Sequence, residues 1–273
     1  MDKSILLYYF SGTGNSRRLT EVAAKRFEEV GFKAKIRNIE EKGLAEGHND
    51  YSCYGFIFPV HFRGIPHIMT KFMAALPLET GKEAFIIVSM GNIGYGISPS
   101  QGKCLGQGKS ILEGRGYKVV GGHAVTMPNN FIALVGASTP EMAAPVIEAG
   151  EKAVGEFIEK IIDGEFYMEK THWPTKLMGI TTNPLFLYGR KYVSSFFRLD
   201  DRCDSCGICA KICPVGNIEM VNGRPEWGRG CESCFRCINL CPKEAIQCTF
   251  IGRTEKRRRY KEPHLKVKDL MRE

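Results

Sequence analysis

Eight of the eleven cysteines fall into two copies of one spacing, in which three cysteines stand three residues apart and a fourth precedes a proline. The first copy runs from Cys203 to Pro214 and the second from Cys231 to Pro242. Three close thiolates and one distant thiolate suit an iron–sulfur cluster, because so short a loop cannot close a tetrahedral cage alone. Cys-x-x-Cys pairs also bind zinc, but zinc gives no reason for the third cysteine or the proline. The spacing therefore predicts iron–sulfur chemistry.

The cysteine-rich region, residues 199–250, resembles the bacterial two-cluster ferredoxins. The resemblance implies an α+β domain with two [4Fe-4S] clusters, each held by three cysteines of one motif and the fourth cysteine of the other. One set of ligands would then be Cys203, Cys206, Cys209 and Cys241. The other set would be Cys231, Cys234, Cys237 and Cys213.

A glycine-rich turn near the N-terminus has the residues of a phosphate site. It follows an apolar run, residues 3–10, and opens a helical pattern from Asn15 to Val30. Backbone N–H groups at a helix N-terminus attract phosphate, and glycines let it approach closely. Arg17 stands where a dinucleotide fingerprint needs glycine, and this turn lacks the Gly-Lys-Ser/Thr of a P-loop. The alternative is a plain turn with an N-cap. The turn consists of Ser11, Gly12, Thr13, Gly14, Asn15 and Ser16.

Strand and helix patterns alternate through the first 163 residues, which predicts a parallel sheet covered by helices on both faces. Short apolar runs predict five strands, at 3–10, 33–38, 53–60, 83–90 and 117–126. Helical spacing predicts helices at 15–30, 66–76, 101–115 and 140–163. Five strands fit an α/β, doubly wound sheet of the flavodoxin-like order 2-1-3-4-5.

The turn at residues 11–16 resembles the FMN-phosphate loop of flavodoxins, Thr/Ser-Gly-Thr-Gly-Asn-Thr/Ser, at every position. The resemblance implies FMN, with two later strand ends holding the flavin ring, because ligands of such sheets bind at the carboxyl ends of strands. We expect Tyr95 to stack on one face of the ring and Phe62 or His61 on the other; a core aromatic and an exposed loop histidine are the alternatives for Tyr95 and His61. The first loop supplies Pro59, Val60, His61, Phe62, Arg63 and Gly64. The second supplies Ser89, Met90, Gly91, Asn92, Tyr95 and Gly96.

The segment between these regions, residues 164–198, has an aromatic stripe. Tyr188, Tyr192 and Phe196 fall on one helical face with Leu185 and Leu199, and Arg190 and Lys191 are placed opposite. We expect this stripe to dock the two domains together, because a mobile linker would be polar. Binding to a membrane surface is the alternative. The predicted domains are thus 1–163, the connection 164–198, 199–250, and a tail of residues 251–273.

The chain carries a formal net charge of +8, and its hydrophobic content is 43%. Eight cluster thiolates would lower that charge, so basicity is weak evidence for nucleic acid, and none is predicted. A run of Lys and Arg between 253 and 261 is read as a solvated basic tail, with an acidic protein partner or nucleic acid as the alternatives. No apolar run reaches the roughly 18 residues of a membrane span, and the N-terminus has no signal-peptide pattern, so a cytoplasmic protein is expected.

The whole chain resembles the flavodoxin–ferredoxin fusion proteins of anaerobic microbes. That resemblance implies an oxidoreductase that links one-electron donors such as ferredoxin to an FMN-dependent reduction. A redox partner protein is then expected, and a small-molecule acceptor and a homodimer stay open. A non-catalytic electron carrier for a larger enzyme and a redox sensor are the alternatives.

Overall fold

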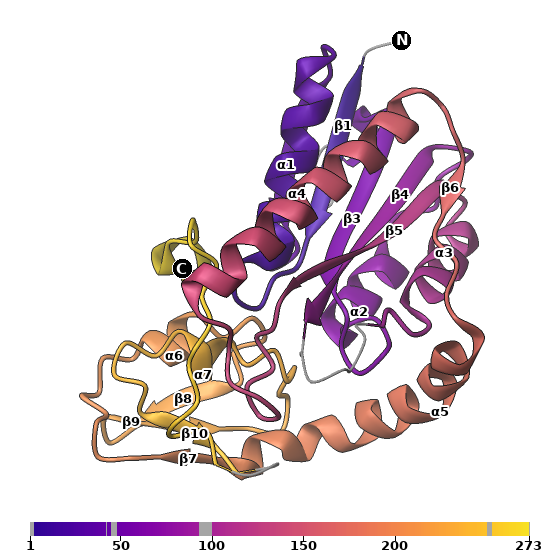
Figure 1. The fold of residues 1–273 in the computed structure, drawn as a ribbon. Coiled ribbons are helices and arrows are strands. Elements are labelled where there is room, and N and C mark those ends of the chain that lie inside the picture. The colour runs from indigo at the N-terminus through magenta and orange to yellow at the C-terminus, as the bar shows by residue number, and fades with distance from the viewer. Residues whose placement is uncertain (1–2, 42, 45–47, 93–99, 250–252, 273) are drawn as a thin grey trace.

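The computed structural model describes residues 3–41, 43–44, 48–92, 100–249 and 253–272. Its largest unit is a six-stranded sheet of order β2-β1-β3-β4-β5-β6, in which every pair of neighbours is parallel. Helices cover both faces of this sheet, and a smaller unit with short strands lies beyond one end (Figure 1). The strand order is that of the flavodoxin-like fold, with one strand added at an edge.

The elements of the first unit agree with the sequence patterns to within a few residues. The strands are β1 (Ser4–Tyr9), β2 (Lys33–Asn38), β3 (Cys53–Pro59), β4 (Glu83–Asn92), β5 (Lys118–Pro128) and β6 (Tyr167–Met168). The helices are α1 (Asn15–Glu29), α2 (His67–Ala75), α3 (Cys104–Gly114) and α4 (Pro140–Ile162), and a 3-10 turn, η1, spans His48–Asp50.

Strand β1 is buried on both faces because its side chains alternate between two apolar cores. Ile5 and Leu7 pack in the core that α1 and α4 cover. Leu6 and Tyr8 pack in the core that α2 and α3 cover. Burial on both faces explains why this strand is a continuous apolar run.

The prediction of five strands omitted β6. Tyr167 and Met168 pair in parallel with Gly121 and Gly122 of β5 and extend the sheet by a sixth strand. Two residues are too few for a periodic pattern, so nothing in the local sequence marks this strand.

The second unit is built from short elements around the cysteine motifs. A hairpin joins β8 and β9 through Asn222 and Gly223, whose positive φ angles of 49° and 77° suit the tight turns of β-hairpins. The other strand pair, β7 with β10, is also antiparallel. The elements are β7 (Phe197–Leu199), α6 (Ile208–Lys211), β8 (Ile218–Val221), β9 (Arg224–Trp227), α7 (Arg236–Asn239) and β10 (Ile246–Cys248).

The connection between the units packs through a different face from the predicted one. Helix α5 (Trp173–Gly189) runs into the 3-10 turn η2 (Arg190–Phe196). Leu185, Tyr188 and Tyr192, expected to be buried, are 72%, 69% and 47% exposed. Because α5 is apolar around its circumference, periodicity could not select its buried face, and the change to a 3-10 turn alters the period after Gly189.

One inward side chain of this connection, Arg190, was predicted to lie on its polar face, opposite the aromatic stripe. The Arg190 guanidinium lies 3.6 Å from the buried Glu232 carboxylate and donates to the Cys231 carbonyl oxygen. Val193 and Phe197 are buried in the core of the second unit.

No helix within the described ranges is long and apolar enough to cross a membrane.

The basic tail packs on the rest of the chain, although Arg253, Lys256, Arg258 and Lys261 are exposed, as expected for a solvated run. Tyr260, Leu265 and Leu270 are each 5% exposed or less. Arg257 donates to the carbonyl oxygens of Ile132 and Ala133, so its charge serves an internal contact. The tail ends in a 3-10 turn, η3 (Val267–Leu270), and returns the chain from the second unit to the first (Figure 1).

A substitution in the tail tests its structural role. Leu265→Ala should lower the free energy of unfolding by about 2–5 kcal/mol, because it removes a buried side chain from a small core. Urea unfolding of the anaerobically purified protein measures this effect. The exposed neighbour Lys266 gives the control, and Lys266→Ala should change stability by less than about 0.5 kcal/mol. Equal, small effects of both substitutions would restore the solvated-tail interpretation.

Candidate functional site

The cysteines line two separate pockets, and each pocket draws on both motifs. The first, the outer pocket, is lined by Cys203, Cys206, Cys209 and Cys241. The second, the inner pocket, is lined by Cys213, Cys231, Cys234 and Cys237. These are the two groups of four that the resemblance to ferredoxins implied, so the fold brings together the side chains expected to share a cluster.

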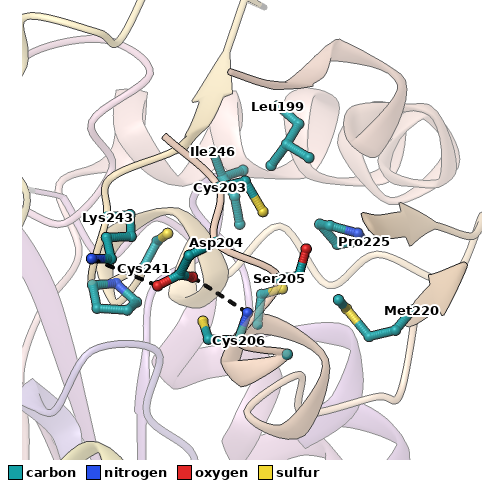
Figure 2. Close-up of a pocket in the computed structure, with 13 residues that line it drawn as sticks. Leu199, Cys203, Asp204, Ser205, Cys206, Met220, Pro225, Cys241, Lys243 and Ile246 are labelled. Atoms are coloured by element: carbon teal, nitrogen blue, oxygen red, sulfur yellow. Dashed lines mark hydrogen bonds and ion pairs between the residues drawn. The ribbon is translucent and has the colours of Figure 1, made fainter. Parts of the chain in front are cut away.

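Figure 2 shows the outer pocket, with Cys203, Cys206 and Cys241 among the side chains that line it. Cys206 is exposed, and its backbone N–H donates to the Asp204 carboxylate over 3.3 Å. Lys243 lies 3.6 Å from the same carboxylate, from the loop that carries Cys241. Ser205 and Gly207 have positive φ angles of 62° and 70°, which turn the chain sharply between the cysteines. The sharp turns of this loop therefore place its thiols around one common pocket.

The inner pocket offers hydrogen-bond donors to sulfur. The backbone N–H of Asn217 donates to Cys213 Sγ over 3.2 Å, and that of Ser233 to Cys231 Sγ over 3.4 Å. Burial raises the pKa of Cys237, and a hydrogen bond from the indole N–H of Trp227, which lines the same pocket, opposes that rise. The sulfur of a cluster ligand would accept the same hydrogen bond. The donors present thus fit an iron–sulfur cluster.

Burial favours the protonated form of three of these thiols, those of Cys209, Cys231 and Cys234. Desolvation raises the pKa of Cys209 and of Cys231 to about 11, and that of Cys234 to about 12. Cluster ligands must be thiolates, so cluster binding has to supply the free energy of deprotonation. Across the described ranges, the cysteine pockets included, no three Cys, His, Asp or Glu side chains are placed to hold a single metal ion.

A third pocket lies at the carboxyl ends of the central strands, where the three predicted loops meet. It draws on the glycine-rich turn after β1 (residues 11–16, called the phosphate loop from its predicted role), on the end of β3 with the two residues that follow it, and on the last residues of β4. Pro128, the last residue of β5, and Asn130, two residues beyond it, also line the pocket and were not predicted; their place at a strand's carboxyl end was the available signal. From the predicted set the pocket includes Ser11, Gly12, Thr13, Asn15, Ser16, Pro59, Val60, His61, Ser89, Met90 and Gly91.

The phosphate loop is arranged as an anion site. Gly14, with φ 113°, precedes α1, and no side chain caps that helix. The backbone N–H of Gly14 donates to Ser11 Oγ over 3.0 Å. Thr13 Oγ1 accepts from the Asn130 side chain over 3.1 Å, which leaves the Thr13 hydroxyl proton for a ligand. Ser16 and Ser89 share a hydrogen bond of 2.9 Å between their hydroxyls. An uncapped helix terminus flanked by hydroxyl donors fits a phosphate.

Part of the first flavin-ring loop turns away from this pocket. Phe62 and Arg63 have positive φ angles of 45° and 60°. The Phe62 ring stacks on Phe186 of α5, with centroids 3.8 Å apart, so that face is not available to a flavin. Gly64 packs against Asn183 of the same helix. Sequence periodicity could not show that α5 would cover these residues.

The remaining predicted ring contacts are His61 and the second loop. His61 lines the pocket, and burial lowers its pKa to about 4, so its imidazole is neutral at pH 7. Asn92 ends β4. Tyr95 and Gly96 lie outside the described residues.

Residues 196–242 match the model of the family described as a 4Fe-4S dicluster domain. The chain joins a flavodoxin-like domain to a 4Fe-4S dicluster domain. The strand order assigns the first domain and the family match assigns the second.

Solved flavodoxins show distant similarity to the chain. A flavodoxin from Streptococcus pneumoniae TIGR4 has 13% identity and a TM-score of 0.41, and covers 59% of this chain and 97% of its own. Flavodoxin 2 from Bacillus cereus has 16% identity and a TM-score of 0.41, and covers 57% and 99%. The Megasphaera elsdenii flavodoxin has 18% identity and a TM-score of 0.38, and covers 56% and 98%. No curated protein matches the chain.

One buried arginine fastens the dicluster domain to the phosphate loop. Arg236 stands between Cys234 and Cys237, is fully buried, and makes a bidentate pair with the Glu40 carboxylate over 2.6 and 2.7 Å. It also donates to the carbonyl oxygens of Ser11, Gly12 and Ile212. Burial opposes the charge, but Glu40 outweighs it and raises the pKa of Arg236. All five guanidinium N–H donors are thus satisfied across the boundary.

Removal of this side chain should be costly. Arg236→Met leaves Glu40 buried without its partner and should lower the free energy of unfolding by about 3–5 kcal/mol. The double substitution Arg236→Met with Glu40→Met should cost less than the sum of the single ones. Urea unfolding of the anaerobic holoprotein measures all three, and exposed Arg229→Met is the control. Additive effects in the double variant would contradict direct pairing.

Proposed function

We propose that the chain is an iron–sulfur flavoprotein that passes electrons between two [4Fe-4S] clusters and FMN, and links a one-electron donor such as a ferredoxin to a flavin-dependent reduction. The observation that carries this proposal is the contact between the inner cysteine pocket and the phosphate loop. A Cβ atom on Gly12 would lie 2.9 Å from the Cys234 carbonyl oxygen. The two candidate cofactor sites therefore share a boundary within one chain, which suits direct electron exchange.

Residues of both sites have distinct parts in this proposal. The first turn of α1 and the hydroxyls of Ser11 and Thr13 would hold the FMN phosphate, and His61, Met90 and Asn130 would border the rest of the cofactor. FMN exchanges one or two electrons and a cluster exchanges one, so their combination can connect one-electron carriers to a two-electron reaction. The chain's contribution is to hold the two sites against each other through Arg236.

The outer pocket is the side that a protein partner can reach. Cys206 is exposed there, whereas none of the four inner cysteines is exposed. Arg202, Asp204 and Lys243 are exposed around the opening and carry charges of both signs. We place the docking of the electron-donating partner at this opening, with the inner pocket on the side of the phosphate loop.

Substitution of Thr13 tests the phosphate site. Thr13→Val keeps the β-branched shape but removes a hydroxyl donor, so FMN affinity should fall by about 1.5–3 kcal/mol, the worth of a hydrogen bond to a charged group. Riboflavin lacks the phosphate and should bind wild type and variant equally. Fluorescence titration of the flavin-free protein measures both affinities. If both flavins weaken alike, Thr13 supports the fold and not the phosphate.

A second substitution tests the crossed ligand sets and the order of the sites. Cys213 is part of the first motif, but Cys213→Ala should remove the cluster that the cysteines of the second motif hold. The iron content should therefore fall from about eight to about four atoms per chain. FMN should stay bound, because its site belongs to the other domain. With reduced ferredoxin in stopped-flow experiments, bleaching of the flavin absorbance should slow at least about tenfold, since the site beside the phosphate loop is emptied.

Cys104 provides the matched control, because it is a buried cysteine outside both motifs. Cys104→Ala should keep all of the iron and the full rate of flavin bleaching. An unchanged bleaching rate in Cys213→Ala, with half of the iron lost, would contradict the role of the inner pocket. Loss of FMN together with the iron would contradict separate sites.

A further inference from the structure

Helix α5 exposes a broad apolar face. Trp173, Leu177, Ile180, Leu185 and Tyr188 are between 52% and 72% exposed. Trp173, Leu177, Ile180 and Tyr188 follow one another at steps of four, three and eight residues, which places them on one side of a helix. An apolar face of this width on a water-soluble protein marks a surface that another body covers.

The opposite face of α5 is fully engaged, so only the outer face is available. An ideal Cβ on Gly179 would lie 3.0 Å from the Arg63 carbonyl oxygen. Asn183 is completely buried, and its side-chain amide donates to the His61 carbonyl oxygen over 3.2 Å. Phe186 stacks on Phe62. The helix therefore offers one side to a partner and cannot be surrounded by it.

The charges of the segment indicate what that partner is. Residues 170–199 contain five Lys or Arg residues and no Asp or Glu. Arg190 faces inward and pairs with Glu232, whereas Lys170, Lys176 and Arg198 are exposed. The Lys191 ammonium lies 4.7 Å from the centroid of the Tyr188 ring and 5.1 Å from that of Tyr192, both of which are exposed rings. Tryptophan and tyrosine prefer the headgroup level of a bilayer, and nearby cations bind anionic lipids.

We propose that the outer face of α5, together with Lys191 and Tyr192 of η2, lies on the surface of an anionic membrane. A symmetric contact with a second copy would bring two cationic segments together, so the charges oppose that occupant. A lipid surface instead accepts the apolar side chains among its acyl chains and the ammonium groups among its phosphates. The inner face would keep the loop at residues 61–64 close to that surface.

Vesicle co-sedimentation of the holoprotein tests the proposal. The protein should bind vesicles of 70% phosphatidylcholine and 30% phosphatidylglycerol at about 0.1 M salt, and much less to phosphatidylcholine alone. The variant Leu177→Ser with Leu185→Ser should bind at least about tenfold more weakly, because two exposed leucines no longer enter the bilayer. Lys176→Glu with Lys191→Glu should lose the preference for the anionic vesicles.

Controls use equally exposed side chains elsewhere. Leu78 is 74% exposed, and Leu78→Ser should bind as the wild type does. Lys25→Glu on α1 is the control for charge. Iron and FMN content should equal those of the wild type in every variant, since the altered side chains are exposed or, at Lys191, partly exposed. The fluorescence of Trp173 should shift to the blue on binding, and Trp173→Phe should remove the shift.

Three results would overturn the proposal. The first is no binding to the anionic vesicles. The second is equal loss of binding in Leu78→Ser and in the α5 variant. The third is a dimer in light scattering that the Leu177→Ser, Leu185→Ser variant converts to monomer, which would assign the face to a second copy of the chain.

Discussion

The buried pair of Arg236 and Glu40 is the constraint on which the arrangement of the two domains depends. A guanidinium that is buried away from water destabilises the fold unless every N–H donor has a hydrogen-bond acceptor and its charge is balanced by an opposite one. Here the partners come from both domains: the Glu40 carboxylate and two carbonyl oxygens of the phosphate loop on one side, and the Ile212 carbonyl oxygen on the other. Because each partner has a fixed direction, the arginine sets position as well as proximity. The inner cysteines, on either side of it, are thereby placed beside the loop.

Two further segments hold the same region from different directions. Helix α5 leads from the first domain to the second and supports the loop at residues 61–64 on its way. The tail returns and covers the outer side of the phosphate loop, where the Glu262 N–H donates to the Thr13 carbonyl oxygen over 2.9 Å. The Tyr260 hydroxyl donates to the Asn15 side chain over 2.6 Å. The phosphate loop is thus contacted by its own domain, by the dicluster domain and by the tail, which favours one rigid geometry over a swinging tether.

Motifs whose geometry is local could be predicted from the sequence. The turn from Ser11 to Ser16 and the eight cysteines act through spacing along a short stretch of chain, and the structure gathers them as expected. The alternation of strands and helices is also local, and it led to the correct sheet order apart from β6. Phe62 shows the limit: its place in a strand-end loop was predicted, but its partner Phe186 is 124 positions later, and the stacking of these rings decides where Phe62 points.

The periodicity of this chain was sufficient to predict the alternating strands and helices of its first domain, because backbone conformation and short-range burial leave periodic traces in a sequence. The cysteine groups and the phosphate loop were predicted from motifs that resemble those of ferredoxins and flavodoxins. The contacts between domains leave no such traces. Arg236 and Glu40 are 196 positions apart. From the sequence alone, an arginine within a cysteine motif cannot be distinguished from an exposed arginine; only the structure shows that Arg236 is buried. The buried sides of the tail and of the aromatic connection were not predicted, for the same reason. Which side of a segment is buried depends on surfaces supplied by distant residues, so the folded chain alone reveals it.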